Sequence, residues 1–121
     1  MKRLTPFLVA GLLLIAMGAF PRAAHTQSAT VTDDNLTQSI QNAKTTADHE
    51  AIAAYYDQEA AEAEKKAALH RQSASNLKPV GMANMCHSLA KYWDKVAAQD
   101  KELASAHRAM AKGAEGSKTG Q

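Results

Sequence analysis

The chain has little of what most catalytic and cofactor sites are built from. Its 121 residues include one cysteine, Cys86, three prolines and 5% aromatic residues. A lone cysteine provides no C-x-x-C pair for attaching haem, and it cannot close a disulfide within the chain. The sequence also has no H-E-x-x-H motif and no glycine-lined nucleophile turn. We therefore predict that the protein is not an enzyme.

A strong excess of charge is also missing. The chain carries 14 Lys and Arg against 12 Asp and Glu. Lys2, Arg3 and Arg22 lie in the first 26 residues, and without them eleven basic residues stand against twelve acidic ones. Binding to nucleic acid through charge requires clustered Lys and Arg, which displace counterions from phosphates. The near-equal numbers of basic and acidic residues therefore predict that the protein has no nucleic-acid partner.

The one long apolar run lies at the N-terminus. A basic start precedes an uncharged run of 14 residues from Phe7 to Phe20, and Pro21 and small residues follow it. A membrane-spanning helix needs about 20 such residues, whereas the shorter run is typical of a signal peptide. We expect residues 1–26 to be a secretory signal that is cleaved off, and an uncleaved membrane anchor is the alternative. Before cleavage this segment is the only part of the chain that is predicted to contact a membrane. The mature protein is then periplasmic or secreted.

The composition after residue 26 is typical of helices, because alanine dominates together with Glu, Lys and Gln. Thr32 is expected to cap a short first helix. Thr45, followed by Asp48, resembles a capping box that starts a long second helix. The segment 76–81 contains Pro79 and Gly81 and separates this helix from a third one. Gly113 is expected to end the third helix, where a disordered tail over 113–121 begins.

A short loop between two long helices predicts an antiparallel hairpin. Apolar residues at spacings of 3 and 4 define the expected inner face of each helix. In the second helix these are Ile52, Tyr56, Ala60, Ala63, Ala67, His70, Ala74 and Leu77; in the third they are Met82, Met85, Leu89, Tyr92, Val96, Gln99, Leu103, Ala106 and Met110. Small residues of one helix would then face large residues of the other.

The predicted fold class is all-α: an antiparallel helical hairpin over residues 27–112, with a short N-terminal helix. Its core would be thin, because the mature chain has few large apolar side chains and each ordered residue costs about 1.5 kcal/mol. Either the first helix docks as a third member or two hairpins pair as a homodimer. The second arrangement, a dimeric four-helix bundle, is favoured.

Histidine, methionine and cysteine gather at the two ends of such a hairpin. A turn near residues 78 and 79 places His49 opposite His107, and His70 opposite Cys86. The candidate metal ligands are His70, Met82, Met85 and Cys86 at one end, and His49, His107 and Met110 at the other. Thiolate, thioether and imidazole together suit Cu(I), and to a lesser extent Zn²⁺. The sequence therefore predicts a copper or zinc site, and sequestration of copper as the function.

Structural roles are open for the same residues. The methionines fall on the predicted seam, where this side chain usually fills space. His49 and His107 lie near helix ends, where imidazole can cap a helix or interact with its dipole. Cys86 could be buried, bind metal or form a disulfide with a second chain. An envelope scaffold without a metal is therefore the alternative function.

A protein partner in the envelope would fit this second function. Leu36-Thr37 resembles the start of the L-T-x-x-Q motif of the Spy/CpxP family of periplasmic stress chaperones, with Ile40 in place of the glutamine. The resemblance covers only these few residues of an exported, small, all-helical chain. It implies a chaperone-like interaction protein and assigns no functional residue.

Overall fold

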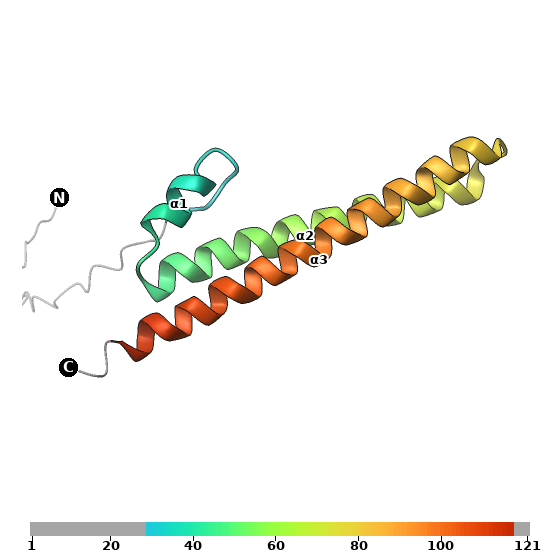
Figure 1. The fold of residues 1–121 in the computed structure, drawn as a ribbon. Coiled ribbons are helices and arrows are strands. Elements are labelled where there is room, and N and C mark those ends of the chain that lie inside the picture. Colours follow the sequence, from blue (N-terminus) through green and yellow to red (C-terminus); the bar gives the residue numbers. More distant parts are fainter. Residues whose placement is uncertain (1–28, 118–121) are drawn as a thin grey trace, which may run out of the picture.

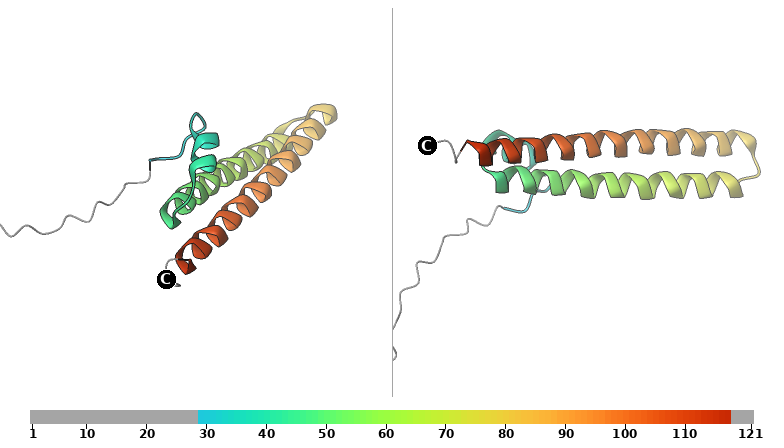
Figure 2. Two further views of the ribbon diagram at one scale, coloured as in Figure 1. Left: turned by 60° about the vertical axis from the view of Figure 1, so that its left-hand side comes forward. Right: turned by 90° about the horizontal axis from the view of Figure 1, so that it is seen from below.

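The computed structural model describes residues 29–117, and the predicted signal peptide lies outside this range. Three helices follow in order: α1 (Leu36–Asn42), α2 (Thr46–Asn76) and α3 (Val80–Gly116). The two long helices run antiparallel and lie side by side along their length, and α1 sits at the end away from the turn (Figures 1 and 2). The all-α class and the hairpin with a short N-terminal helix are thus confirmed for this part of the chain.

The capping box at the start of α2 forms as predicted. The backbone N–H of Asp48 donates to the Thr45 hydroxyl oxygen at 3.1 Å, and the Thr45 N–H donates to the Asp48 carboxylate at 2.9 Å. At the other end of the hairpin the loop is shorter than expected, and α3 already begins at Val80. The third helix also continues past Gly113 to Gly116, because strong helix formers offset the cost of a glycine, about 1 kcal/mol.

The predicted start of the first helix was wrong. Thr32 does not cap it; its own N–H donates to the side-chain oxygen of Asn35 at 2.8 Å, and α1 begins only at Leu36. This local turn competes with helix formation, as short polar side chains often do. The segment is held to α2 by Tyr55, whose hydroxyl donates to Asp33 at 2.7 Å. Because the carboxylate accepts this proton, the pKa of Tyr55 is well above its usual value.

Alanines form the seam between the two long helices. The buried alanines of α2 include Ala53, Ala60, Ala67 and Ala74, and those of α3 include Ala90, Ala97, Ala104 and Ala111. In each helix they recur at every seventh residue, the repeat that keeps one face turned toward a partner helix. Alanine side chains let two helix backbones approach closely. The predicted inner face of α2 is correct, with Ala53 as an addition.

The predicted inner face of α3 is wrong. Its large residues lie on the outside of the hairpin, in a column beside the seam. They are exposed to between 41% and 67%: Met82, Met85, Leu89, Tyr92, Leu103 and Met110. The helix is turned by about one residue, roughly 100°, from the expected orientation. Buried alanines of α3 therefore face α2 where Leu89 and Leu103 were expected, and of the large residues considered for the inner face Trp93 is half-buried.

Three exposed ion pairs are compatible with this rotation of α3. They join Asp57 to Arg108, Glu64 to Lys101 and Arg71 to Asp94, at intervals of seven residues along each helix. Turning Leu89 and Leu103 toward α2 would carry the α3 members of these pairs away from their partners. The observed register joins opposite charges at all three positions, whereas sliding the helices by one heptad would place Glu64 opposite Asp94, or Arg71 opposite Lys101.

Candidate functional site

Two histidines meet at the end of the hairpin that carries α1. His49 lies in the first turn of α2 and His107 near the end of α3, and their Nδ1 atoms are 3.2 Å apart. The ring centroids are separated by 5.5 Å. Next to them the Thr46 hydroxyl donates to the backbone oxygen of Ala111 at 3.1 Å. This hydrogen bond ties the two helices together at the level of the histidines.

His107 is the more enclosed of the pair. Among the described residues it is the only buried polar or charged side chain, with 7% of its surface exposed. The ring of Tyr56 stacks on it with centroids 6.0 Å apart. Burial lowers the pKa of His107, and the nearby His49 lowers it further. The imidazole of His107 is therefore neutral at pH 7.

Two chemical states are compatible with facing Nδ1 atoms. In one, a neutral ring donates its N–H to the lone pair of the other ring. In the second, both rings turn a lone pair toward a shared cation. Two nitrogens that each bind one metal ion at about 2.0–2.1 Å in tetrahedral geometry lie roughly 3.3 Å apart. The observed separation of 3.2 Å is close to this value.

The protein offers one further soft donor nearby. Met110 follows His107 by one helical turn and is 49% exposed, so its thioether is open to solvent and to a bound ion. Within residues 29–117 no group of three or more His, Cys, Asp or Glu side chains is placed to hold a metal ion. A metal on the two histidines would thus be completed by Met110 or by water.

The other end of the hairpin is related to this one by an internal repeat. Residues of α2 recur in α3 37 positions later: Tyr55 and Tyr92, Asp57 and Asp94, His70 and His107, Arg71 and Arg108. The ion pairs obey the same relation, since exchanging the helices turns Asp57–Arg108 into Asp94–Arg71. The hairpin therefore has approximate two-fold symmetry. This symmetry relates the pair His49–His107 to the pair Cys86–His70.

His70 and Cys86 occupy those equivalent seam positions, and both are half-buried. The methionines assigned to the same end do not share the seam with them. Met82 is 54% exposed and Met85 is 67% exposed on the outer surface of α3. The proposed four-residue cluster is thus divided between an inner pair and two outer thioethers. The repeat and the charge pattern, which would have indicated this arrangement, were present in the sequence but overlooked.

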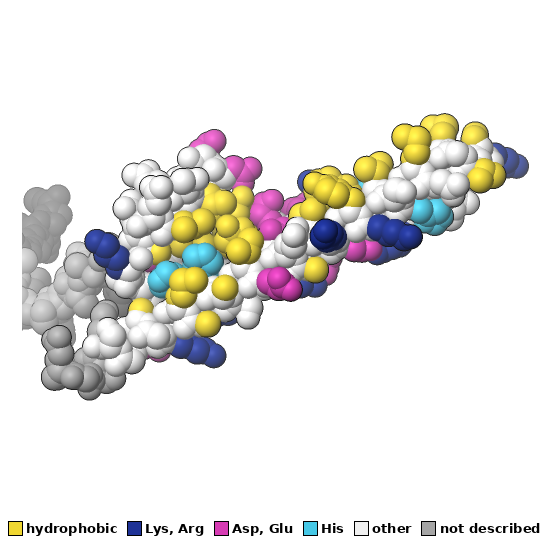
Figure 3. All heavy atoms as spheres, in the orientation of Figure 1, with side chains coloured by type: hydrophobic (Ala, Val, Ile, Leu, Met, Phe, Trp, Pro, Cys, Tyr) yellow, Lys and Arg dark blue, Asp and Glu magenta, His cyan; other side chains and the backbone are white. Residues whose placement is uncertain are grey.

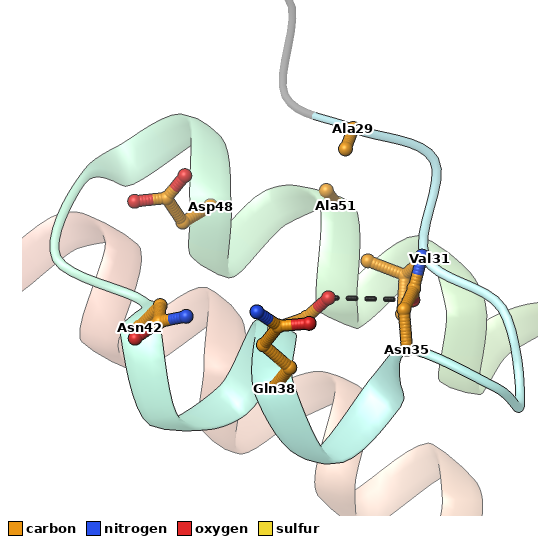
Figure 4. A pocket seen from close by; sticks show the side chains of 8 residues that line it. Ala29, Val31, Asn35, Gln38, Asn42, Asp48 and Ala51 are labelled. Atoms are coloured by element: carbon orange, nitrogen blue, oxygen red, sulfur yellow. Dashed lines mark hydrogen bonds between the residues drawn. The ribbon is translucent and has the colours of Figure 1, made fainter.

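A cavity of about 320 Å³ lies between α1, the segment before it and the start of α2 (Figure 4). Amide, hydroxyl and small side chains line it, including Gln38, Ser39 and Asn42. Its one ionisable side chain, Asp48, already caps α2. The cavity therefore contains no pair of groups suited to acid–base or nucleophilic chemistry.

Comparison with known proteins gives no family for this chain: no family model, curated protein or solved structure matches it. Among the helices of residues 29–117, none combines the length and the apolar character that crossing a membrane requires.

Proposed function

We propose that this is an exported, non-enzymatic helical protein of the cell envelope that binds or sequesters a soft metal ion, copper rather than zinc. The observation that supports this proposal best is the 3.2 Å separation of the His49 and His107 Nδ1 atoms. The spacing suits two ligands of one ion. The neutral state of His107 leaves a lone pair available, because metals bind unprotonated imidazole.

The neighbouring donors favour copper. Thioether and thiolate sulfur prefer Cu(I), and imidazole accepts both copper and zinc. Met110 lies one turn from His107, and Cys86 with His70 forms the related pair at the opposite end. The three exposed methionines do not fill the hairpin core, so the packing role considered for them is absent within the hairpin. The N-terminal pattern over residues 1–26 supports export to the periplasm or beyond.

The test is an anaerobic Cu(I) titration in competition with a chromophoric chelator, repeated with Zn²⁺. We expect the purified chain to withdraw Cu(I) from the chelator, and His49→Ala to weaken this at least roughly tenfold. His87→Ala is the matched control, because His87 is exposed on α3 and has no place in the seam. Circular dichroism verifies that each variant is folded.

A chain that never competes for Cu(I), or a His49→Ala variant that competes as well as the parent, would exclude the histidine site. The double variant His70→Ala with Cys86→Ser examines the other end. If only this double variant fails to compete with the chelator for Cu(I), the metal binds at the turn end of the hairpin. The assignment to His49 and His107 is then wrong.

A second candidate function rests on the outer face of α3. Six large apolar residues there are more than two-fifths exposed, and isolated soluble proteins rarely leave so continuous an apolar strip uncovered. We propose as the alternative an interaction protein of the envelope, either a dimeric four-helix bundle or a chaperone-like scaffold. Suppression of the aggregation of an unfolded protein would favour the scaffold, and sedimentation as a dimer would favour the bundle.

A further inference from the structure

The outer column of α3 is uncharged along almost the whole helix. We use the name outer stripe for Met82, Met85, Leu89, Tyr92, Val96, Gln99, Leu103, Ala106 and Met110. It extends over about 42 Å at 1.5 Å per residue. Within the described residues α1 packs on α2 and not on α3, so it leaves this stripe open. Figure 3 shows hydrophobic side chains gathered on one face of the hairpin, both beside α1 and toward the turn.

The stripe is self-complementary. Every seventh residue along its inner edge reads Met82, Leu89, Val96, Leu103, Met110, which is the same from either end. A two-fold axis through Val96 would therefore place methionine against methionine and leucine against leucine on two antiparallel copies of α3. This pattern is compatible with an isologous interface, in which residue i of one copy contacts residue j of the other and j contacts i.

The border of the stripe is charged, and the position of α1 favours the antiparallel arrangement. Lys95 and Glu102 border the stripe on its solvent side, are exposed, and form no ion pair within residues 29–117. With the axis through Val96, Lys95 lies about 3 Å along the helix axis from Lys95 of the other copy and about 7.5 Å from its Glu102, so the two lysines are flanked by two glutamates. Antiparallel packing also sends the two α1 helices to opposite ends, whereas parallel packing would crowd them at one end.

We propose that the outer stripe is covered by a second copy of this chain, with the two α3 helices antiparallel around a two-fold axis near Val96. The second copy is inferred from the symmetric sequence of the stripe, and the antiparallel orientation from the position of α1. His49 and His107 lie on the seam with α2, outside the stripe, whereas the stripe contains Met110, which the proposed function also names as a donor.

Single-cysteine cross-linking tests the geometry. In a Cys86→Ser background, Val96→Cys and Met82→Cys are each treated with a short bis-maleimide. The axis brings the two copies of residue 96 together, so Val96→Cys forms a covalent dimer. Two copies of residue 82 lie about 42 Å apart along the helix axis. Met82→Cys alone therefore gives no covalent dimer, but it links to Met110→Cys when the two variants are mixed.

Sedimentation of charge variants supplies a second measurement. Leu89→Lys should convert the dimer to a monomer that remains helical, while Ala98→Lys, on the far side of α3, should leave it dimeric. Self-linking of Met82→Cys as efficient as that of Val96→Cys would show a parallel pair. A parent chain that sediments as a monomer would show that no second copy covers the stripe. Either result overturns the proposal.

Discussion

The two apolar faces of α3 differ in residue size and in what they contact. The seam toward α2 consists of alanines at every seventh residue, and the outer stripe beside it consists of Met, Leu, Val and Tyr. The smaller residues are buried within the chain and the larger ones remain at the surface. The face that meets α2 is thus the one that allows close backbone approach, although burial of leucine gains more free energy per residue.

The largest expected effect comes from filling the seam. Ala97→Leu should destabilise the hairpin by about 1–3 kcal/mol or more, because the extra atoms must push two closely packed helices apart. Its control is Ala98→Leu, one residue further on an exposed face, which should stay within about 0.5 kcal/mol of the parent. Urea unfolding followed by circular dichroism measures both. Equal stability of the two variants would mean that the alanine face does not form the seam.

Acidification should also weaken the seam. The pKa of His107 is lowered in the folded chain, so the unfolded chain binds more protons as the pH falls below the ordinary value of 6.5. The stability contributed by His107 is therefore present at neutral pH and is lost on acidification. We expect the melting temperature to fall by several degrees, about 4–8 °C for each kcal/mol lost.

The relevant measurement is a set of thermal melts from about pH 7.5 to about pH 5.5, with a chelator present so that metal release does not contribute. His107→Gln should flatten this dependence. Should the parent and His107→Gln respond equally to pH over this range, protonation of the buried histidine is not what weakens the seam.

Shortening a side chain of the outer stripe should have little effect on the stability of a single hairpin. Leu103 is 41% exposed, so Leu103→Ala, measured at dilutions where the chain is monomeric, should cost well below the 2–5 kcal/mol typical of a fully buried leucine. Urea unfolding followed by circular dichroism measures this loss of stability. If Leu103→Ala lowers the free energy of unfolding of the monomer by 2–5 kcal/mol, Leu103 lies in the hairpin core. The alanine seam and the outer stripe would then not differ in burial.

The smallest effect is expected from one ion pair at the edge of the seam. Asp94 and Arg71 are both about half exposed, so Asp94→Ala should cost roughly 0.2–1 kcal/mol, and added salt should reduce the difference. Exchanging the charges, Arg71→Asp with Asp94→Arg, should recover the loss. If exchange destabilises the chain more than the single change does, another contact of Arg71 or Asp94 determines the result.

Local signals in the sequence predicted much of this architecture. The Thr45–Asp48 capping box and the 3–4 spacing of the α2 alanines depend on near neighbours in the chain, and both predictions are confirmed. The level at which His49 and His107 face each other along the hairpin followed from the position of the turn. Their ring contact also needs the observed rotation of α3, which the apolar spacing did not predict.

The orientation of α3 could not be predicted from apolar spacing alone. Leu89 and Ala90 belong to adjacent columns with the same seven-residue period, and a ranking by hydrophobicity selects the wrong one. The charged residues that pair between the helices, Arg71 with Asp94 and Glu64 with Lys101, follow the observed orientation. The assignment of Met82 and Met85 to an inner cluster failed for the same reason.

Helices α2 and α3 meet along their alanine faces, and this contact brings His49 to His107. Methyl and aromatic NOEs in the labelled chain measure both features. We expect methyl contacts between alanines of α2 and α3, such as Ala60 with Ala97, and ring contacts between His49 and His107. Contacts from the Leu89 and Leu103 methyls to the α2 alanines, with the alanine–alanine and histidine contacts missing, would contradict this arrangement.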